Sequence, residues 1–267
     1  MKLQTIEYPF TLLTPCFSGT ALGKRADHAE MRVPPIRGHV RFWHRALFDA
    51  PDCNRVWGSA SGNAGQGSRV ALRFYGETSP CQGSSSAKIL PHKSNFERPA
   101  IASGAQLTLR LQRLVGCTND DWEHARRAVK LWLLVGALGL RANRAAGSVW
   151  PAGGWAPVDD DALRRLLRND PSKGGLDFTW AVQLSDNAHG CKAEELRAIA
   201  SNTLGGSPSF FGGIKPSRRP SPLKFKVIRL GGQFRLLALA KDPGTISGAW
   251  RELTAKPLQT KLTWTSL

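Results

Sequence analysis

The chain has 267 residues, of which 37 are Lys or Arg and 20 are Asp or Glu, so its formal net charge is +17. The 41% apolar content excludes a disordered chain and fits one large domain or two small ones. A charge excess of this size repels itself in a compact chain, and a polyanionic partner would relieve that repulsion. Nucleic acid is the commonest such partner, and a basic surface that only confers solubility is the plainer alternative.

The cysteines and the apolar runs narrow the class of protein further. The chain has five cysteines, an odd number, and no two of them stand at C-x-x-C spacing. This argues against a zinc site or a disulfide framework, so we expect no metal and no cofactor. The longest apolar run covers 131–140, far short of the roughly 20 residues that span a bilayer. We expect no membrane segment and a cytoplasmic protein with reduced thiols.

The first half of the chain predicts an α+β fold with the element order of a ferredoxin-like or RNA-recognition (RRM-like) unit. The predicted elements are a strand over 3–13, a helix from about 35, strands over 68–76 and 105–115, a helix from about 119 to 139, and a strand over 148–150. Asn119 or Asp120 is expected to cap the second helix. The resulting order, βαββαβ, predicts a ferredoxin-like domain over residues 1–155.

The second half, residues 156–267, predicts a smaller region of the same kind. A Pro- and Gly-rich junction surrounds a short helix at 159–168. The elements predicted after it are a strand near 177–184, a helix near 192–201 and strands over 223–230 and 233–240. Gly231 and Gly232 between the last two strands are a hairpin signal. We interpret this region as a second, degenerate ferredoxin-like domain.

The helix predicted from Pro35 has two faces of different character. An apolar stripe recurs at helical spacing and consists of Ile36, Val40, Trp43 and Leu47. A cationic face lies beside it and consists of Arg37, Arg41, His44 and Arg45. Gly38 lowers helix stability by about 1 kcal/mol relative to Ala, which predicts a close approach by another backbone or by a ligand. We expect the cationic face to bind phosphate, and a solvated helix face is the alternative.

Three basic loops are predicted to add to this RNA-binding surface. The candidates are Lys24, Arg25 and Arg32 in the charged loop 18–34, Arg141, Asn143 and Arg144 after the second helix, and Lys215, Arg218 and Arg219 in the loop 205–222. Small residues in the loop 141–147 would let a backbone approach a phosphate. Phe210 and Phe211 stand beside the third loop, where they would stack on bases or else pack in the core.

Catalysis is the second class of function that the residues leave open. His28, with Asp27 or Glu30, could act as a general base on a 2′-hydroxyl in metal-independent RNA cleavage. A lone His beside two acidic residues is common in loops, and the chain has no P-loop, nucleophile elbow or HExxH motif. We therefore expect no enzyme, with an endoribonuclease as the alternative and a general RNA chaperone as a third class.

Several runs of residues resemble one known family. They are Thr14-Pro15-Cys16-Phe17-Ser18-Gly19, the stretch PPIRGHVRFWHRAL from Pro34 to Leu47, Val56-Trp57-Gly58-Ser59, the glycine-containing loop from Leu138 to Val149, and Arg218-Arg219-Pro220-Ser221-Pro222-Leu223. Together they resemble the RAMP superfamily of CRISPR proteins. The spacing P-x-I-R-G-x-x-R-F-W-x-R is similar to that of the subunit that caps the head of the type III-B (Cmr) effector complex.

This resemblance implies a fold, partners and a role. The fold would be of RNA-recognition type, built from two ferredoxin-like units. The partners would be the 3′ part of the CRISPR guide RNA, the target RNA and neighbouring RAMP subunits of the effector complex. The chain would be a non-catalytic subunit in antiviral defence, because in this family other subunits cut the target and synthesise cyclic nucleotides.

Overall fold

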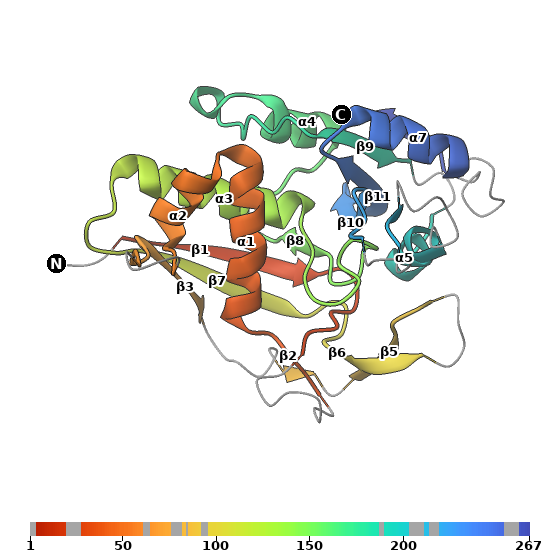
Figure 1. Ribbon diagram of the computed structural model, residues 1–267. Helices are drawn as coiled ribbons and strands as arrows, with labels where there is room; N and C mark the ends of the chain where they lie inside the picture. Colours follow the sequence, from red (N-terminus) through yellow and green to blue (C-terminus); the bar gives the residue numbers. More distant parts are fainter. Residues whose placement is uncertain are drawn as a thin grey trace.

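Two four-stranded antiparallel sheets with helices packed on them form a mixed α/β fold (Figure 1). The computed structural model describes residues 4–19, 28–60, 65–75, 82–83, 85–91, 96–186, 190–202, 211–213, 219–253 and 262–267. The sequence predicted the α+β class, and these antiparallel sheets and helices confirm it.

The first sheet comes from the first half of the chain. Its strands are β1 (Thr5–Leu12), β3 (Val70–Tyr75), β7 (Gln106–Arg113) and β8 (Val149–Pro151), in the order β3-β7-β1-β8. The two long helices, α1 (Val33–Leu47) and α3 (Asn119–Val135), pack on each other and on the sheet (Figure 1). All six elements predicted for this half are therefore present, within a few residues of their predicted limits.

The start of α3 differs by one residue from the prediction. Thr118, and not Asn119 or Asp120, is the N-cap, and its hydroxyl accepts a hydrogen bond from the Asp121 backbone. The Asp121 carboxylate accepts one from the Thr118 backbone in return, which completes a capping box. The helix ends at Val135, before Gly136, and therefore stops short of the predicted end near Gly139.

The sequence reading missed a third helix in this half, α2 (Ala50–Trp57). Its N-cap is Asp49, whose side chain accepts a hydrogen bond from the Asp52 backbone. Two small pairs of strands complete the first half, β2 (Ala29–Glu30) with β4 (Gln82–Gly83), and β5 (Ser85–Lys88) with β6 (Glu97–Ala100). The predicted loop 18–34 thus contains β2 and the first two residues of α1.

The second sheet repeats the chain order of the first. After α4 (Asp160–Arg168) and the short 3-10 helix at Pro171–Lys173, the elements are β9 (Ala181–Ser185), α5 (Ala193–Asn202), β10 (Lys224–Leu230), β11 (Gln233–Ala240), α7 (Pro243–Leu253) and β12 (Trp264–Ser266). The sheet order β10-β11-β9-β12 matches β3-β7-β1-β8 position for position. The sequence did not predict α7 and β12, so this half is more complete than expected. The predicted boundary between residues 155 and 156 falls between β8 and α4 and stays a prediction.

One continuous hydrophobic core joins the two sheets, and a buried lysine lies within it. Lys226 on β10 is 0% exposed, and its Nζ donates a hydrogen bond of 2.6 Å to the Leu133 carbonyl near the end of α3. The same Nζ lies 5.6 Å from the ring centre of Trp150 on β8. Burial lowers the pKa of Lys226 well below its ordinary value. This side chain therefore links the second sheet to α3 and β8 of the first half, and its burial disfavours the protonated form.

Replacing Lys226 by Met is expected to make the free energy of unfolding less dependent on alkaline pH. Below the pKa of an unfolded lysine the unfolded chain takes up a proton that the folded chain does not, so stability is lost as the pH falls from about 10 toward 7. As the pH rises, the free energy of unfolding of the wild type should increase relative to that of Lys226→Met by about 1.4 kcal/mol for each pH unit over which folded Lys226 stays neutral. Urea unfolding of both proteins at pH 7 and 9.5 measures this, and a constant difference between them would contradict it.

Candidate nucleic-acid interface

Helix α1 divides into the two faces that its sequence predicts. Ile36, Val40 and Trp43 are buried in the core, while Arg37 and Arg41 are half-buried on another side of the helix. Arg45 continues this row one turn further on and is exposed. Residues four apart are neighbours on a helix surface, so the three guanidinium groups form one row. We call Arg37, Arg41 and Arg45 the arginine row.

The arginine row also holds the helix that sequence reasoning missed. The Arg37 guanidinium donates a hydrogen bond to the Trp57 carbonyl, and that of Arg41 donates to the Gly58 carbonyl at the end of α2. Arg41 also donates to Asn54 Oδ1 at 3.0 Å. Cationic side chains at a helix C-terminus satisfy carbonyls that lack partners within the helix. Part of the row's function is therefore structural.

These contacts bring no negative charge to the arginine row. The groups that accept its hydrogen bonds are carbonyl and amide oxygens and a thiol, none of which is anionic. Burial and, after it, the adjacent charge of Arg41 lower the pKa of Arg37. Arg37 and Arg41 line a pocket of about 420 Å³ whose other walls are Gly58, Ser59, Ala60 and Gln66. An anion in this pocket would relieve the repulsion between the two cations.

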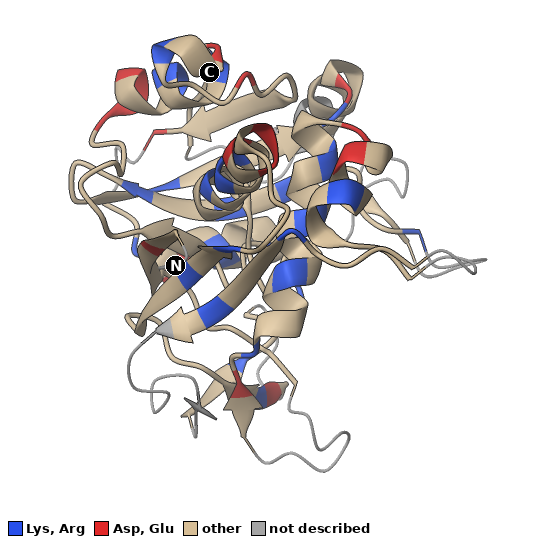
Figure 2. Ribbon diagram, turned by 90° about the vertical axis from the view of Figure 1, so that its left-hand side faces the viewer, with Lys and Arg blue, Asp and Glu red and all other residues tan. Residues whose placement is uncertain are grey.

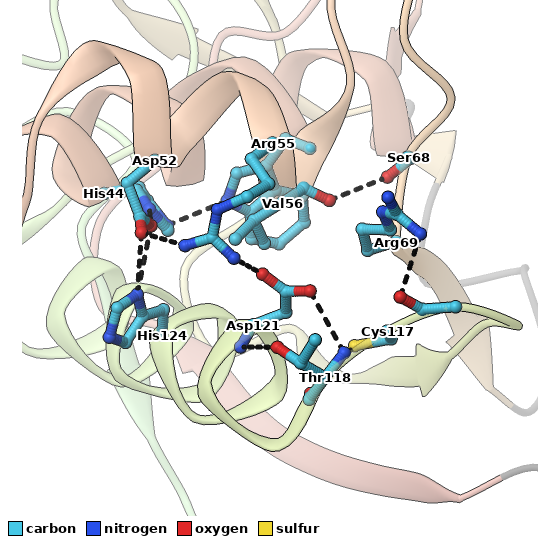
Figure 3. A network of polar contacts seen from close by, with 12 residues as sticks. His44, Asp52, Arg55, Val56, Ser68, Arg69, Cys117, Thr118, Asp121 and His124 are labelled. Carbon is cyan, nitrogen blue, oxygen red and sulfur yellow. Dashed lines mark hydrogen bonds and ion pairs between the residues drawn. The ribbon is translucent and has the colours of Figure 1, made fainter.

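His44 faces the core, which contradicts the prediction that it contacts RNA. Its side chain is 0% exposed, and its Nδ1 accepts a hydrogen bond of 3.0 Å from the indole of Trp57. Its Nε2 therefore carries the proton and donates to Asp52 Oδ1 at 2.8 Å. Burial lowers the pKa of His44 to about 4, so the imidazole is neutral at pH 7. Figure 3 shows this histidine beside Asp52, with His124 below them.

Asp52 is the centre of a polar network that ties α1, α2 and α3 together (Figure 3). Besides His44, it accepts a hydrogen bond of 3.0 Å from Nδ1 of His124 on α3. It also pairs with Arg55, whose other nitrogen pairs with the buried carboxylate of Asp121. Burial opposes ionisation of Asp52, but hydrogen bonds from both histidines lower its pKa overall. The network fixes α2, and thereby the carbonyls on which the arginine row rests.

Arg144 and Gly147 in the loop 141–147 are held against the protein itself. Arg144 is 5% exposed and donates to the Phe211 carbonyl at 2.6 Å, which contradicts its predicted contact with RNA. Burial and, after it, the charge of Arg141 lower the pKa of Arg144 to about 10. Gly147 has φ +61°, and a Cβ there would lie 2.0 Å from the Leu138 carbonyl oxygen. The close backbone approach predicted for this loop is therefore made to the chain itself.

The other predicted residues lie apart from one another. Arg141 is half-buried and donates to Ser201 Oγ at 3.3 Å, and Arg32 lies 3.8 Å from the Glu30 carboxylate. Arg219 is exposed, and Phe211 is buried in the core, as the alternative reading of this phenylalanine expected. Lys24, Arg25, Asp27, Phe210, Lys215 and Arg218 lie outside the described residues. His28 lines a pocket of about 300 Å³ with Ser18 and Arg98.

Lys224, which was not predicted as a site residue, contacts the predicted site residue Asn143. It is the first residue of β10, and its Nζ donates to Asn143 Oδ1 at 3.0 Å. Lys224 and Lys226 stand two residues apart on an apolar strand, a spacing that puts both on one face of the sheet. Lysines are rarely buried unless they have a partner, so two of them on the core side of a strand indicate specific polar contacts. Lys224 joins Asn143, a predicted site residue, to the second sheet.

Basic residues are spread widely over the molecule. Figure 2 shows Lys and Arg distributed over helices and strands of the side that faces the viewer. Within the described ranges, no group of three or more His, Cys, Asp or Glu side chains is placed to hold a metal ion. No helix among these residues has the length and apolarity needed to cross a membrane. The arginine row is thus a local concentration within a generally basic surface.

Comparisons with known proteins identify the fold. No protein-family model matches the sequence, and a search of curated proteins found no match. Among solved structures, apo Cmr1 from Pyrococcus furiosus is similar over 98% of both chains, with 18% identity and a TM-score of 0.61. The chain has the fold of Cmr1. The likeness to Cmr proteins that the sequence motifs indicated is thereby confirmed at the level of fold.

Two further solved structures agree with Cmr1. One is a chain of the type III-B Cmr-beta complex bound to cognate target RNA, with 11% identity over 96% of this chain and 99% of that chain and a TM-score of 0.55. The other is the same kind of complex with target RNA, AMPPnP and single-stranded DNA present, with 11% identity, coverage of 95% and 99%, and a TM-score of 0.57. The likeness spans nearly the whole of every chain.

Proposed function

We propose that this chain is a non-catalytic, RNA-binding subunit of a type III-B CRISPR effector complex, which would act in the cytoplasm. The observation that carries the proposal is the likeness to Cmr1, which extends over 98% of both chains. Two other structural neighbours are chains of Cmr-beta complexes bound to cognate target RNA. A formal charge of +17 is suited to a polyanionic partner. The RNA partners would be the 3′ part of the guide and the target.

The topology supports two ferredoxin-like units within this fold. Each half contains strand, helix, strand, strand, helix and strand, and each sheet places its second and third strands together at one edge. Such an order interleaves two split βαβ crossovers, which is the ferredoxin-like arrangement. We infer that the second unit is a full one, since α7 and β12 supply the last two elements.

The arginine row is the RNA contact that we propose first. Guanidinium groups bind phosphate in planar, often bidentate geometry, and such contacts position a backbone without reading its sequence. Base pairing between guide and target would then supply the specificity, as in other RNA-guided systems. Arg32, Arg141 and Arg219 are half-buried or exposed and remain candidates for weaker contacts, whereas the burial of His44 and Arg144 removes these two.

Co-purification tests the proposed function. The tagged chain would be co-expressed with the other type III-B subunits and a CRISPR array, and the purified material would be examined by mass spectrometry and RNA sequencing. The proposal predicts co-elution with neighbouring RAMP subunits and a discrete guide RNA. Recovery of the chain with ribosomal or mixed cellular RNA and none of those subunits would instead support a general RNA chaperone.

The alternative function, a RAMP endoribonuclease, rests on His28. This histidine lies in a pocket of about 300 Å³ with Arg98, a pairing of a general base with a cation that could stabilise a cleaved phosphate. We expect pure chain to leave labelled CRISPR repeat RNA intact in EDTA, assayed on a denaturing gel. The matched variant is His28→Ala. Cleavage by the wild type that disappears in this variant would establish the enzyme and overturn the non-catalytic role.

A further inference from the structure

A second pocket lies where the two halves of the chain meet, on the other side of α1 from the arginine row's carbonyl partners. It has a volume of about 360 Å³, and its walls come from α1, from the segment after α3 and from the start of β10. Its lining includes Gly38, His39, Phe42, Asn143, Lys224 and Phe225. Pockets of a few hundred Å³ with an apolar lining and a few converging polar groups are typical of small-ligand sites.

Gly38 keeps this pocket open. A Cβ built on Gly38 would have no atom within 4 Å, so no part of the described chain needs a glycine at this position. Its place inside α1 nevertheless lowers helix stability by about 1 kcal/mol relative to Ala. The close approach that Gly38 predicts is therefore not made by the protein's own backbone. A ligand in the pocket would be the group that approaches.

Phe42 provides an aromatic surface at the mouth of the pocket. It is 36% exposed, so part of its ring is accessible to a ligand. The rings of Trp43 and Trp180 contact it in edge-to-face geometry, with centroids 5.0 and 6.0 Å away. These contacts hold the Phe42 ring in a fixed orientation. A rigid aromatic ring beside a cationic side chain, here Lys224, is a feature on which single-stranded nucleic acids stack their bases.

Polar donors converge on the same pocket. The Nζ of Lys224 lies 4.9 Å from the centre of the Phe42 ring and uses one of its donors on Asn143 Oδ1. The amide nitrogen of Asn143 and the remaining hydrogens of Lys224 could serve the carbonyl and ring-nitrogen acceptors of a base. Burial, and after it Arg144, lower the pKa of Lys224 to about 8, and burial and Lys224 lower that of His39. An acceptor in the pocket would restore the lost solvation of Lys224.

We infer that this pocket binds one unstacked nucleobase of the RNA, which stacks on Phe42 and accepts hydrogen bonds from Lys224 and Asn143. The inference rests on the proposed RNA binding and adds to it a contact with a base, whereas the arginine row contacts phosphates. It requires no sequence specificity, because every base has a flat face and acceptor atoms.

The test uses the full chain and two fluorescently labelled 12-nucleotide probes, a single-stranded RNA and a ribose-phosphate strand of the same length without bases. Two variants address the pocket. Phe42→Leu removes the ring and keeps an apolar side chain, and Gly38→Leu puts a side chain into the pocket from a position where a Cβ would have no atom within 4 Å. Phe96→Leu is the matched control, because Phe96 is 50% exposed and does not line this pocket. Thermal melts show that each variant is folded.

We expect both pocket variants to bind the RNA about 5- to 100-fold more weakly than the wild type does. Both should bind the strand without bases as tightly as the wild type binds it. Phe96→Leu should match the wild type on both probes. Wild-type affinity of the folded Phe42→Leu and Gly38→Leu variants would overturn the inference and leave the proposed function intact. Equal losses on both probes would also overturn it, since the pocket would then bind phosphate. Binding of neither probe by the wild type would overturn the proposed RNA binding as well.

A free nucleotide is the other source of a base, and a competition assay separates the two. Millimolar AMP or UMP should displace the RNA only weakly from the wild type, because a free nucleotide lacks the contacts to the arginine row. Tight binding of either nucleotide to the wild type and not to Gly38→Leu would show that the pocket serves a free nucleotide, and would overturn the assignment to RNA.

Discussion

Replacing Arg37, Arg41 and Arg45 together by Gln is expected to weaken binding to single-stranded RNA by roughly 10- to 100-fold at physiological salt and to flatten its salt dependence. Each phosphate contact on a single strand contributes about 0.7 to the slope of log K against log salt, so three lost contacts should lower the slope by about 2. Glutamine removes the charge and keeps an N–H donor for the carbonyls of Trp57 and Gly58. Titrations at several salt concentrations give both quantities.

A control with the same change in net charge separates position from total charge. Arg73, Arg165 and Arg229 are exposed and lie on β3, α4 and β10. Their joint replacement by Gln should leave the RNA affinity within about twofold of the wild type. These three residues are outside the proposed interface, and salt screens charges that lie more than a Debye length, about 8 Å, from the RNA. A folded arginine-row variant with wild-type affinity and slope would remove this helix from the interface.

Asp52→Ala is expected to lower the free energy of unfolding by about 2–4 kcal/mol. The change leaves the buried Nε2 of His44 without its acceptor and takes one partner from Arg55 and one from His124. In a chain of this size each kcal/mol shifts the melting temperature by about 2–4 °C. Thermal and urea unfolding should therefore both show the loss.

The matched control is Glu7→Ala, which removes a carboxylate from a surface ion pair with Arg110 at 2.9 Å. Glu7 is 43% exposed, and exposed pairs of this kind contribute about 0–1 kcal/mol. Similar losses for Asp52→Ala and Glu7→Ala would show that the network around Asp52 does not hold the three helices together.

The faces of α1 could be predicted from its sequence, and one residue on it was assigned to the wrong face. Ile36, Val40 and Trp43 are buried, as their spacing predicts. His44 follows Val40 by four residues, so helical periodicity alone places it in the apolar stripe. Its polar character led to the opposite assignment. Trp57 and Asp52 resolve the conflict, since their hydrogen bonds let a histidine occupy a core position.

The burial of Arg144 and Lys224 could not be predicted, because it depends on segments far away in the sequence. Arg144 is covered by Phe211 and lies 3.3 Å from Ser221 Oγ, 77 residues further along the chain. Lys224 meets Asn143 across a separation of 81 residues. Local patterns carry no record of such pairs. The helix α2 is different, because its sequence does carry a start signal, Asp49 as the N-cap and a proline in the first turn. The helix was missed because its eight residues are too few to show a periodic apolar pattern.

The second unit was underestimated for a similar reason. The segment that forms α7 contains Pro243, Gly244 and Gly248, which weaken any helical pattern. This helix packs on β11, and with it the second half has the same order of elements as the first. Tertiary contact thus outweighs local propensity here, and the equal strand orders of the two sheets became visible only in the folded chain.

The most direct test of the central claim is to find which RNA the chain touches inside the assembled complex. Ultraviolet crosslinking of the purified type III-B complex, followed by isolation of the tagged chain and sequencing of the attached RNA, gives that answer. We predict crosslinks concentrated in the 3′ part of the guide and in the target that pairs with it, and a loss of these crosslinks in the arginine-row variant. Crosslinks confined to the 5′ part of the guide, or none above the background of a subunit without RNA contact, would contradict it.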